Sequence, residues 1–166
     1  AHQLYDIKPD LMGCGKAAGG GILPASFVAG SNEVIGLLTP GSEGSTFGGY
    51  PLASVVGIYA IKVLVEDKLA KNAYERGAQL MEHFKNMQKS FPDKIKEVRG
   101  KGLLTAFEMH KSEHLDGHHV SVELLKDGVY AKETHKSTVR IAPALTIEDW
   151  QIDKLAESIN NVIKKM

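Results

Sequence analysis

The 166-residue sequence contains 20 basic and 20 acidic residues, so its formal net charge is zero. This balance gives no electrostatic reason to expect nucleic acid or an anionic membrane as a partner. The single cysteine excludes an internal disulfide and fits a reducing compartment, and no apolar run is long enough to cross a bilayer. We therefore expect a cytoplasmic protein with no nucleic-acid and no membrane partner.

The first residues do not resemble a natural beginning. Residues 1–6 contain no initiator methionine, and no basic region followed by an apolar stretch marks a signal peptide. The sequence opens in the middle of a pattern. We therefore expect that an N-terminal part of a longer parent protein is missing.

Glycine dominates the first fifty residues. Two short apolar runs, 11–12 and 27–29, flank a stretch of glycine and other small residues, which predicts a strand, a tight loop and a second strand. Lys16 lies in this loop, and its small neighbours leave room for a bulky group to approach the amine. A lysine in an open, partly desolvated pocket can form a Schiff base with a carbonyl compound. A solvated lysine in a flexible loop is the alternative.

Two helices follow a second glycine-rich loop over 39–51. Apolar residues at three- and four-residue spacing predict a helix from Leu52 to Leu64, with Pro51 in its first turn. A second apolar stripe over 73–87 predicts another helix, which ends before Pro92. We place a domain boundary within this helical stretch, with residues 1–66 in one domain and 67–166 in the other.

Short strands and helices alternate in the remainder of the chain. The segments 103–109 and 139–142 predict strands, and residues 122–125 mark a short helix that Gly128 stops. A polar loop is expected at 112–119. This order of elements predicts an α/β fold.

An amphipathic helix closes the sequence. Apolar residues between Ile152 and Ile163 share one face, and Thr146 followed by Asp149 predicts the N-cap. Trp150 is expected in the core, as is Tyr130 in the segment before.

Two glycine-rich motifs could bind a phosphate. Residues 13–18 match the loose dinucleotide pattern G-x-G-x-x-A, but the glycines that follow are a poor helix start, so we reject this reading. Residues 44–49 present Ser45 and Thr46 among glycines shortly before a helix, which suits an anion-binding turn. A connecting turn with a Ser/Thr cap is the alternative.

Arg140 lies within an apolar strand segment. A guanidinium buried there must meet an anion, because an unpaired buried charge is costly. A substrate carboxylate would fit its planar pair of donors, and a structural salt bridge is the alternative. Arg99 is expected to be structural, at the end of a turn into the next strand.

The histidines and acidic residues of 113–119 could suggest a metal site. Their spacing matches no standard zinc pattern, and the loop looks solvated. We therefore expect no metal.

Several segments together resemble class III, fold-type I aminotransferases along essentially the whole chain. They are the lysine segment 8–21, the loop Pro-Gly-Ser-Glu-Gly-Ser-Thr-Phe-Gly-Gly-Tyr-Pro-Leu at 40–52, and Val-Arg-Gly-Lys-Gly-Leu-Leu at 98–104. Within the class, Lys-Glu-Thr-His at 132–135 followed by Val-Arg-Ile-Ala-Pro-Ala-Leu at 139–145 is most similar to the ornithine aminotransferases. Acetylornithine and 4-aminobutyrate aminotransferases share the general plan but resemble the first of these two segments less.

The resemblance implies pyridoxal 5'-phosphate as cofactor. Lys16 would hold it as a Schiff base and carry a proton between the substrate carbon and the cofactor. Ser45 and Thr46 would bind the phosphate of the cofactor in the neighbouring subunit, so the parent would be a homodimer. Arg140 would hold the substrate α-carboxylate. The parent reaction would move the δ-amino group of ornithine to 2-oxoglutarate, giving glutamate semialdehyde and glutamate.

Two features depart from this pattern. Position 50 is tyrosine where the family usually has asparagine, and the bulky ring would change how the loop packs. In this family the aspartate that pairs with the cofactor ring nitrogen, the stacked aromatic residue and most of the phosphate site lie upstream of the lysine. We therefore expect an inactive C-terminal portion, with 1–66 ending the large cofactor domain and 67–166 forming the small domain. A non-catalytic binding module with the same fold is the rival.

Overall fold

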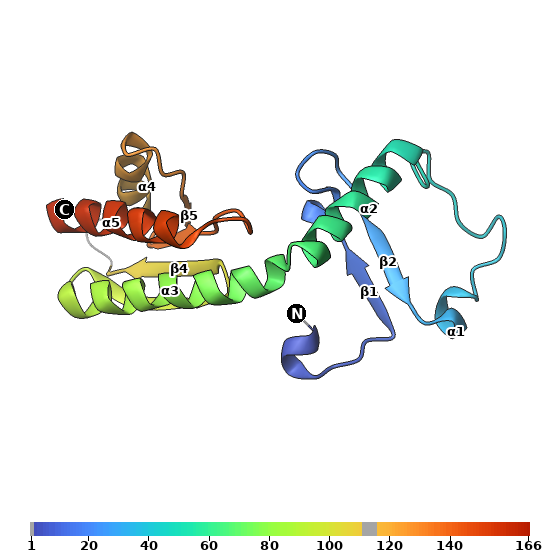
Figure 1. Ribbon diagram of the computed structural model, residues 1–166, viewed down its shortest axis with the longest axis horizontal. Helices are drawn as coiled ribbons and strands as arrows, with labels where there is room; N and C mark the ends of the chain where they lie inside the picture. Colours follow the sequence, from blue (N-terminus) through green and yellow to red (C-terminus); the bar gives the residue numbers. More distant parts are fainter. Residues whose placement is uncertain (1, 111–115) are drawn as a thin grey trace. The chain divides into compact units, whose positions relative to one another are not determined.

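The computed structural model describes residues 2–110 and 116–166 and divides into two compact units (Figure 1). The first unit ends at Asp67 and the second begins at Lys68. Lys68 has a left-handed backbone with φ of +52°, and this residue separates the two long helices that the sequence predicts. The division falls one residue beyond the boundary expected from the sequence.

The first unit pairs two short strands in an antiparallel sheet. The register runs from Leu11 opposite Gly30 to Cys14 opposite Phe27, as expected for the predicted strand, loop and strand. The short helical segments His2–Tyr5 (η1) and Asn32–Ile35 (α1) were not predicted, and the predicted tight loop contains a third, Lys16–Gly19 (η2). The elements are η1 (His2–Tyr5), β1 (Leu11–Cys14), η2 (Lys16–Gly19), β2 (Phe27–Gly30), α1 (Asn32–Ile35) and α2 (Pro51–Glu66).

Helix α2 packs on the η2 turn through small residues. A Cβ added to Gly20 would lie 3.2 Å from the Cβ of Ala60, and one added to Gly57 would lie 3.8 Å from the carbonyl oxygen of Ala18. Most large apolar side chains of α2 are exposed, and Gly19 is the one buried residue among residues 2–67. The first unit therefore has almost no core of its own.

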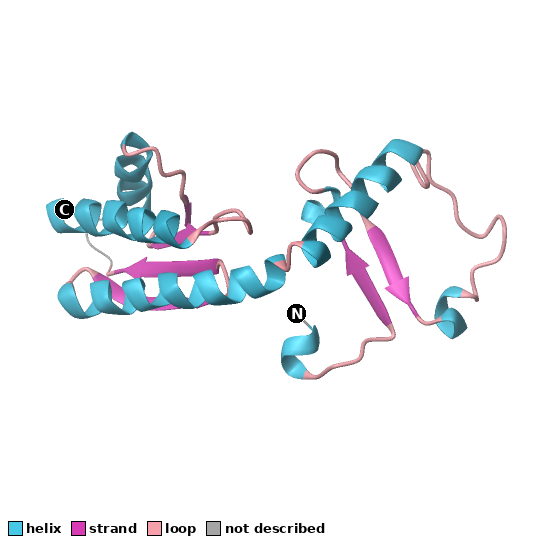
Figure 2. Cartoon of the chain, in the orientation of Figure 1, coloured by secondary structure: helices cyan, strands magenta, loops and turns pink. Residues whose placement is uncertain are grey.

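The second unit is a four-stranded antiparallel sheet covered on one face by three helices (Figures 1 and 2). The strand order is β3-β4-β6-β5. Among the described residues, no helix of either unit is long and apolar enough to cross a bilayer. The elements are α3 (Leu69–Ser90), β3 (Ile95–Lys101), β4 (Leu104–Met109), α4 (Gly117–Lys126), β5 (Lys132–Thr134), β6 (Thr138–Ile141) and α5 (Asp149–Lys165).

The alternation of β4 sorts its side chains between the two faces of the sheet. Phe107 and Met109 are buried against the helices, whereas Ala106 and Glu108 lie on the opposite, open face. The ring of Phe107 meets the ring of Phe84 on α3 edge-on, with centroids 5.5 Å apart. Such pairs add to the stabilisation from apolar burial. The second unit thus contains a single continuous core.

Three predictions in the second unit are wrong about element type or boundary. Arg99 lies within β3 and does not end a turn. The loop expected at 112–119 lies partly outside the described residues, but its last part, from Gly117, is already helix α4. Helix α5 takes its N-cap from Glu148, not from Thr146. Strands β3 and β5 were not predicted.

Two predictions about burial are also wrong. Trp150 is 56% exposed and Tyr130 is 84% exposed. The indole N–H of Trp150 donates to Oε2 of Glu148 at 2.7 Å, which holds the ring at the N-terminus of α5. Large aromatic rings with a polar atom can lie at a surface when that atom finds a partner.

Candidate functional site

Lys16 begins the η2 turn at the end of strand β1. Its backbone is left-handed, with φ of +53°, and its side chain is exposed. Hydrogen bonds close the turn, from Ala18 N–H to the Gly15 carbonyl at 3.2 Å and from Gly20 N–H to the Ala17 carbonyl at 2.9 Å. A residue with a Cβ adopts this conformation at a cost of about 1–3 kcal/mol, and such strain clusters at functional sites. The lysine that the sequence singles out is therefore also conformationally unusual.

Space around Lys16 is open on the β1 side. A Cβ added to Gly13 would meet no atom within 4 Å, and one added to Gly15 would make an ordinary contact with Ser26 at 3.6 Å. Neither glycine is therefore required by a crowding neighbour, and the chain at Gly13 borders open space.

A cavity of about 520 Å³ lies beside this turn, within the first unit. Ser45 and the backbone of Gly48 and Gly49 line it, together with Ala18 of the η2 turn. Neither Lys16 nor Thr46 is among its lining residues, although Thr46 follows Ser45 on the same exposed loop. The predicted phosphate-binding loop therefore borders a hollow next to the lysine turn.

Tyr50, the position that departs from the family pattern, organises the end of this loop. Its ring meets Phe47 edge-on with centroids 6.4 Å apart. Its carbonyl accepts from both the backbone N–H and the hydroxyl of Ser54, each at 3.0 Å. Tyr50 thus packs within the loop and is the N-cap residue of helix α2.

Arg140 lies on β6, in the second unit. The expectation that its guanidinium is buried is wrong, because the side chain is exposed. The strand alternates, so Val139 and Ile141 enter the core and Arg140 points to the open face of the sheet. Within residues 2–110 and 116–166 no carboxylate lies within ion-pair distance of Arg140.

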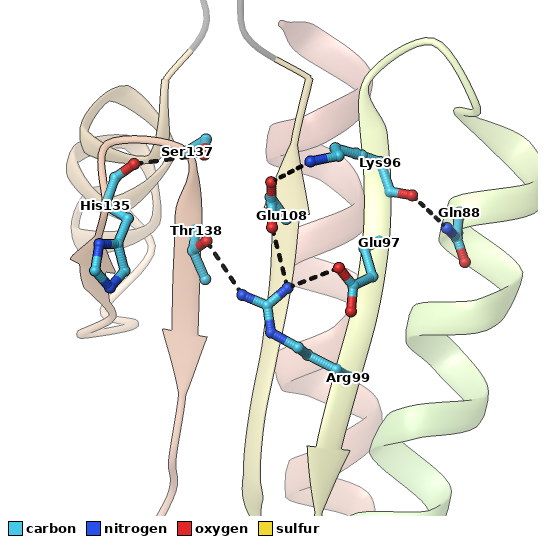
Figure 3. Close-up of polar contacts among 8 residues, drawn as sticks. All are labelled: Gln88, Lys96, Glu97, Arg99, Glu108, His135, Ser137 and Thr138. Atoms are coloured by element: carbon cyan, nitrogen blue, oxygen red, sulfur yellow. Dashed lines mark hydrogen bonds and ion pairs between the residues drawn. The ribbon is translucent and has the colours of Figure 1, made fainter.

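Arg99 has the structural role that the sequence suggests, on the same open face (Figure 3). Its guanidinium lies 3.1 Å from carboxylate oxygens of both Glu97 and Glu108 and donates to the Thr138 hydroxyl at 3.5 Å. Lys96 also donates to Glu108, at 2.7 Å. The hydrogen bond from Lys96, and then that from Arg99, hold the pKa of the Glu108 carboxyl below its ordinary value. This network links three strands.

The last part of the histidine-rich segment forms the N-terminus of helix α4. Asp116 is its N-cap and accepts from the backbone N–H of His119 at 2.9 Å, which lowers the pKa of this carboxyl. His118 Nδ1 lies 3.0 Å from Glu133. Glu113 and His114 lie outside the described residues. In the part of the chain that the structure describes, no three histidine, cysteine or acidic side chains are placed to hold a metal ion.

The candidate residues fall into two groups. Lys16, Ser45 and Thr46 belong to the first unit, and Arg140 belongs to the second. Sequence reasoning did not single out Lys132, which lies directly opposite Arg140 on β5. A predicted hairpin of β5 and β6 would have placed Lys132 beside Arg140. The three residues of β5 are too few to show the period of a strand, so the hairpin could not be predicted.

Comparison with known proteins assigns the chain to a family. The family model for class-III aminotransferases matches residues 1–163. The ornithine aminotransferase of Halalkalibacterium halodurans is 40% identical over 164 residues, which cover 99% of this chain and 39% of that protein. The mitochondrial ornithine aminotransferase of Arabidopsis thaliana is 39% identical, with 99% of this chain and 35% of the relative covered.

Solved structures give the same result. Plasmodium falciparum ornithine delta-aminotransferase matches with a TM-score of 0.87 and 36% identity, over 99% of this chain and 41% of that structure. Acetylornithine aminotransferase from Elizabethkingia anophelis matches with a TM-score of 0.93 and 33% identity, over 100% and 41%. The predicted fold class, an α/β portion of a fold-type I aminotransferase, is confirmed, and the chain spans about two-fifths of these structures. The chain belongs to the class-III aminotransferases.

Proposed function

We propose that this chain is the lysine-bearing portion of a pyridoxal-phosphate-dependent aminotransferase. Residues 1–66 would end the large cofactor domain, and residues 67–166 would form the small domain. The observation that carries the proposal is Lys16, an exposed lysine held in a left-handed turn, to which the sequence resemblance assigns the role of the cofactor lysine. Family membership over residues 1–163 supports it.

The residues present fit the cofactor. Pyridoxal phosphate offers an aldehyde, which needs an accessible amine, and a phosphate, which needs hydrogen-bond donors. The exposed amine of Lys16 and the open space at Gly13 suit the first requirement. The hydroxyls of Ser45 and Thr46 on their exposed loop suit the second. When bound, the cofactor supplies an electron sink for the reacting carbon of the substrate.

Each of these residues would then do a separate part of the work. The Lys16 amine would hold the cofactor and afterwards carry a proton to and from the substrate carbon. Ser45 and Thr46 would donate to the phosphate across the interface of a homodimer. Arg140 would orient the substrate by pairing with its α-carboxylate through two parallel N–H donors.

The favoured substrates are ornithine as amino donor and 2-oxoglutarate as acceptor, giving glutamate semialdehyde and glutamate. The names of the H. halodurans and A. thaliana relatives support ornithine as the donor. An acetylornithine- or 4-aminobutyrate-type donor is the alternative, supported in the first case by the E. anophelis structure. Initial rates of the full-length protein with the three donors separate these possibilities.

The isolated chain would be inactive and would need an upstream part of the protein. Helix α2 exposes large apolar side chains over most of its length, as a surface that another part of the enzyme covers would do. A cytoplasmic location remains our prediction, although the A. thaliana relative is named as mitochondrial.

Borohydride treatment tests the proposal. The full-length protein is supplied with pyridoxal phosphate, reduced, and its attached mass is located by peptide mass spectrometry. We expect the cofactor on Lys16, no cofactor on Lys16→Ala, and normal labelling of the control Lys8→Ala, which changes another exposed lysine of the same unit. Unlabelled wild-type protein without transaminase activity would instead support the non-catalytic binding module, for which Tyr50 is the one local argument.

A further inference from the structure

A row of residues crosses all four strands of the second unit on the open face of its sheet. Lys132 on β5 lies opposite Arg140 on β6, Arg140 lies opposite Ala106 on β4, and Ala106 lies opposite Arg99 on β3. Residues directly opposite on antiparallel strands have Cβ atoms about 4.5–5.5 Å apart and share a face. The row therefore places two cations side by side at its β5–β6 end and a third at its β3 end.

The two ends of this row differ in whether their cations have acidic partners. At the β3 end, Arg99 has two acidic partners, Glu97 and Glu108 (Figure 3). At the other end, the register puts Lys132 against Arg140, and no described carboxylate lies within ion-pair distance of either. Glu133, the next residue of β5, is paired with His118. The open face is therefore locally cationic where β5 and β6 meet.

Like charges directly opposite each other destabilise a sheet. A bound anion removes this repulsion, because it lies between the two cations and attracts both. The planar guanidinium of Arg140 can grip a carboxylate with two N–H donors, and the ammonium of Lys132 can add a mobile point charge. Ala106, on the other side of Arg140, contributes only a methyl group to this face.

We propose that Lys132 and Arg140 together form a binding site for a small organic carboxylate, with Lys132 as a second binding cation. The inference rests on the proposed function, because it extends the carboxylate role of Arg140 to its neighbour. A two-cation site favours a 2-oxo acid, which carries only negative charge, over an amino acid, which brings its own ammonium groups. Lys132 therefore acts mainly on the acceptor substrate.

Steady-state kinetics of the full-length protein provide the first test. Lys132→Met removes one charge-assisted contact, so we expect the KM for 2-oxoglutarate to rise about tenfold. The kcat should change less than about twofold, and the KM for ornithine should change less than that for 2-oxoglutarate. Lys132→Arg keeps the charge and should retain the wild-type KM. The matched control is Lys101→Met, an exposed lysine on β3 that lies opposite Leu104 and outside the row.

Calorimetric titration with glutarate at fixed ionic strength gives a readout that does not depend on activity. We expect glutarate to bind wild type, Lys132→Arg and Lys101→Met with similar Kd, and Lys132→Met about tenfold more weakly. An unchanged Kd in Lys132→Met, or no binding to wild type, would overturn the two-cation site. The borohydride result on Lys16 stands apart from this titration, so failure of the cofactor proposal and failure of this inference are distinguishable.

Discussion

Gly77 marks the closest approach between helix α3 and the turn that joins β3 to β4. A Cβ built on Gly77 would lie 2.2 Å from the carbonyl carbon and the oxygen of Gly102, and 2.6 Å from its Cα. Gly102 itself turns the chain with φ of +54°. The neighbouring atoms are backbone, so no side-chain rotation can make room. We predict that Gly77→Ala destabilises the protein, even though alanine favours a helix.

The size of the effect follows from two opposed terms. Alanine in place of glycine within a helix contributes about 1 kcal/mol of stability. Real Cβ atoms essentially never come closer than 3.0 Å to a neighbour, so the helix or the hairpin must move. Overpacking costs about 1–3 kcal/mol, and a forced shift of backbone lies at or above the upper end. The expected net loss is about 2 kcal/mol.

Urea denaturation followed by Trp150 fluorescence measures this loss, because the single tryptophan of the chain reports on the second unit. Lys85→Ala, at an exposed site of the same helix, should stay within about 0.5 kcal/mol of wild type. Gly57→Ala in α2 has 3.8 Å of room and should be tolerated or stabilising, as judged by circular dichroism. If Gly77→Ala is as stable as wild type, the close packing inferred between α3 and the hairpin is refuted.

Two further predictions concern the sheet. The depressed pKa of Glu108 means that its contacts with Lys96 and Arg99 stabilise the fold above the ordinary carboxyl pKa of 4.5 and are lost as the pH falls through the lower folded pKa. Denaturation curves recorded below pH 5 should therefore show a weaker pH dependence in Glu108→Gln than in wild type, and equal slopes would contradict this. Phe107→Ala should cost about 3–5 kcal/mol in urea denaturation, whereas Tyr130→Ala, at a site that is 84% exposed, should cost less than about 0.5 kcal/mol. Comparable losses in the two variants would mean that burial does not determine stability here.

The long helices could be predicted because their patterns repeat. Helix α2 begins at Pro51 and α3 ends at Ser90, close to the expected limits, since several turns of apolar spacing leave little ambiguity. Strand β5 has three residues, which give no measurable period, and it was missed, whereas the four-residue strands β1, β2 and β6 were predicted from their apolar residues. Strand β3 was also missed, because its sequence is mostly charged. The cap of α5 was misplaced because Thr146 offers the commoner capping residue, whereas Glu148 and Gln151 form the reciprocal pair in the structure.

The environment of the candidate site residues was harder to predict, because the sequence does not show which side chains are buried. An arginine between valine and isoleucine suggests a buried charge, but a sheet with one packed face turns alternate residues outward. Arg140 is therefore exposed. The position of Lys132 beside it depends on the register of β5 against β6, which cannot be deduced from the sequence. The glycines near Lys16 were read as making space, and Gly13 agrees with this, whereas Gly20 fits closely against Ala60.

The two units draw their stability from different sources, and this bears on how Lys16 can work. The second unit has a continuous apolar core, whereas Gly19 alone is fully buried within residues 2–67. The left-handed backbone of Lys16 costs about 1–3 kcal/mol, which is as large as the net contribution expected from the two hydrogen bonds that close the η2 turn. Helix α2 packs on this turn through Gly20 and Ala60, so contacts that cover the exposed side of α2 would hold the turn more firmly. Covering α2 and fixing the backbone of Lys16 are therefore linked, and under the proposed function the affinity of Lys16 for pyridoxal phosphate would depend on what covers α2.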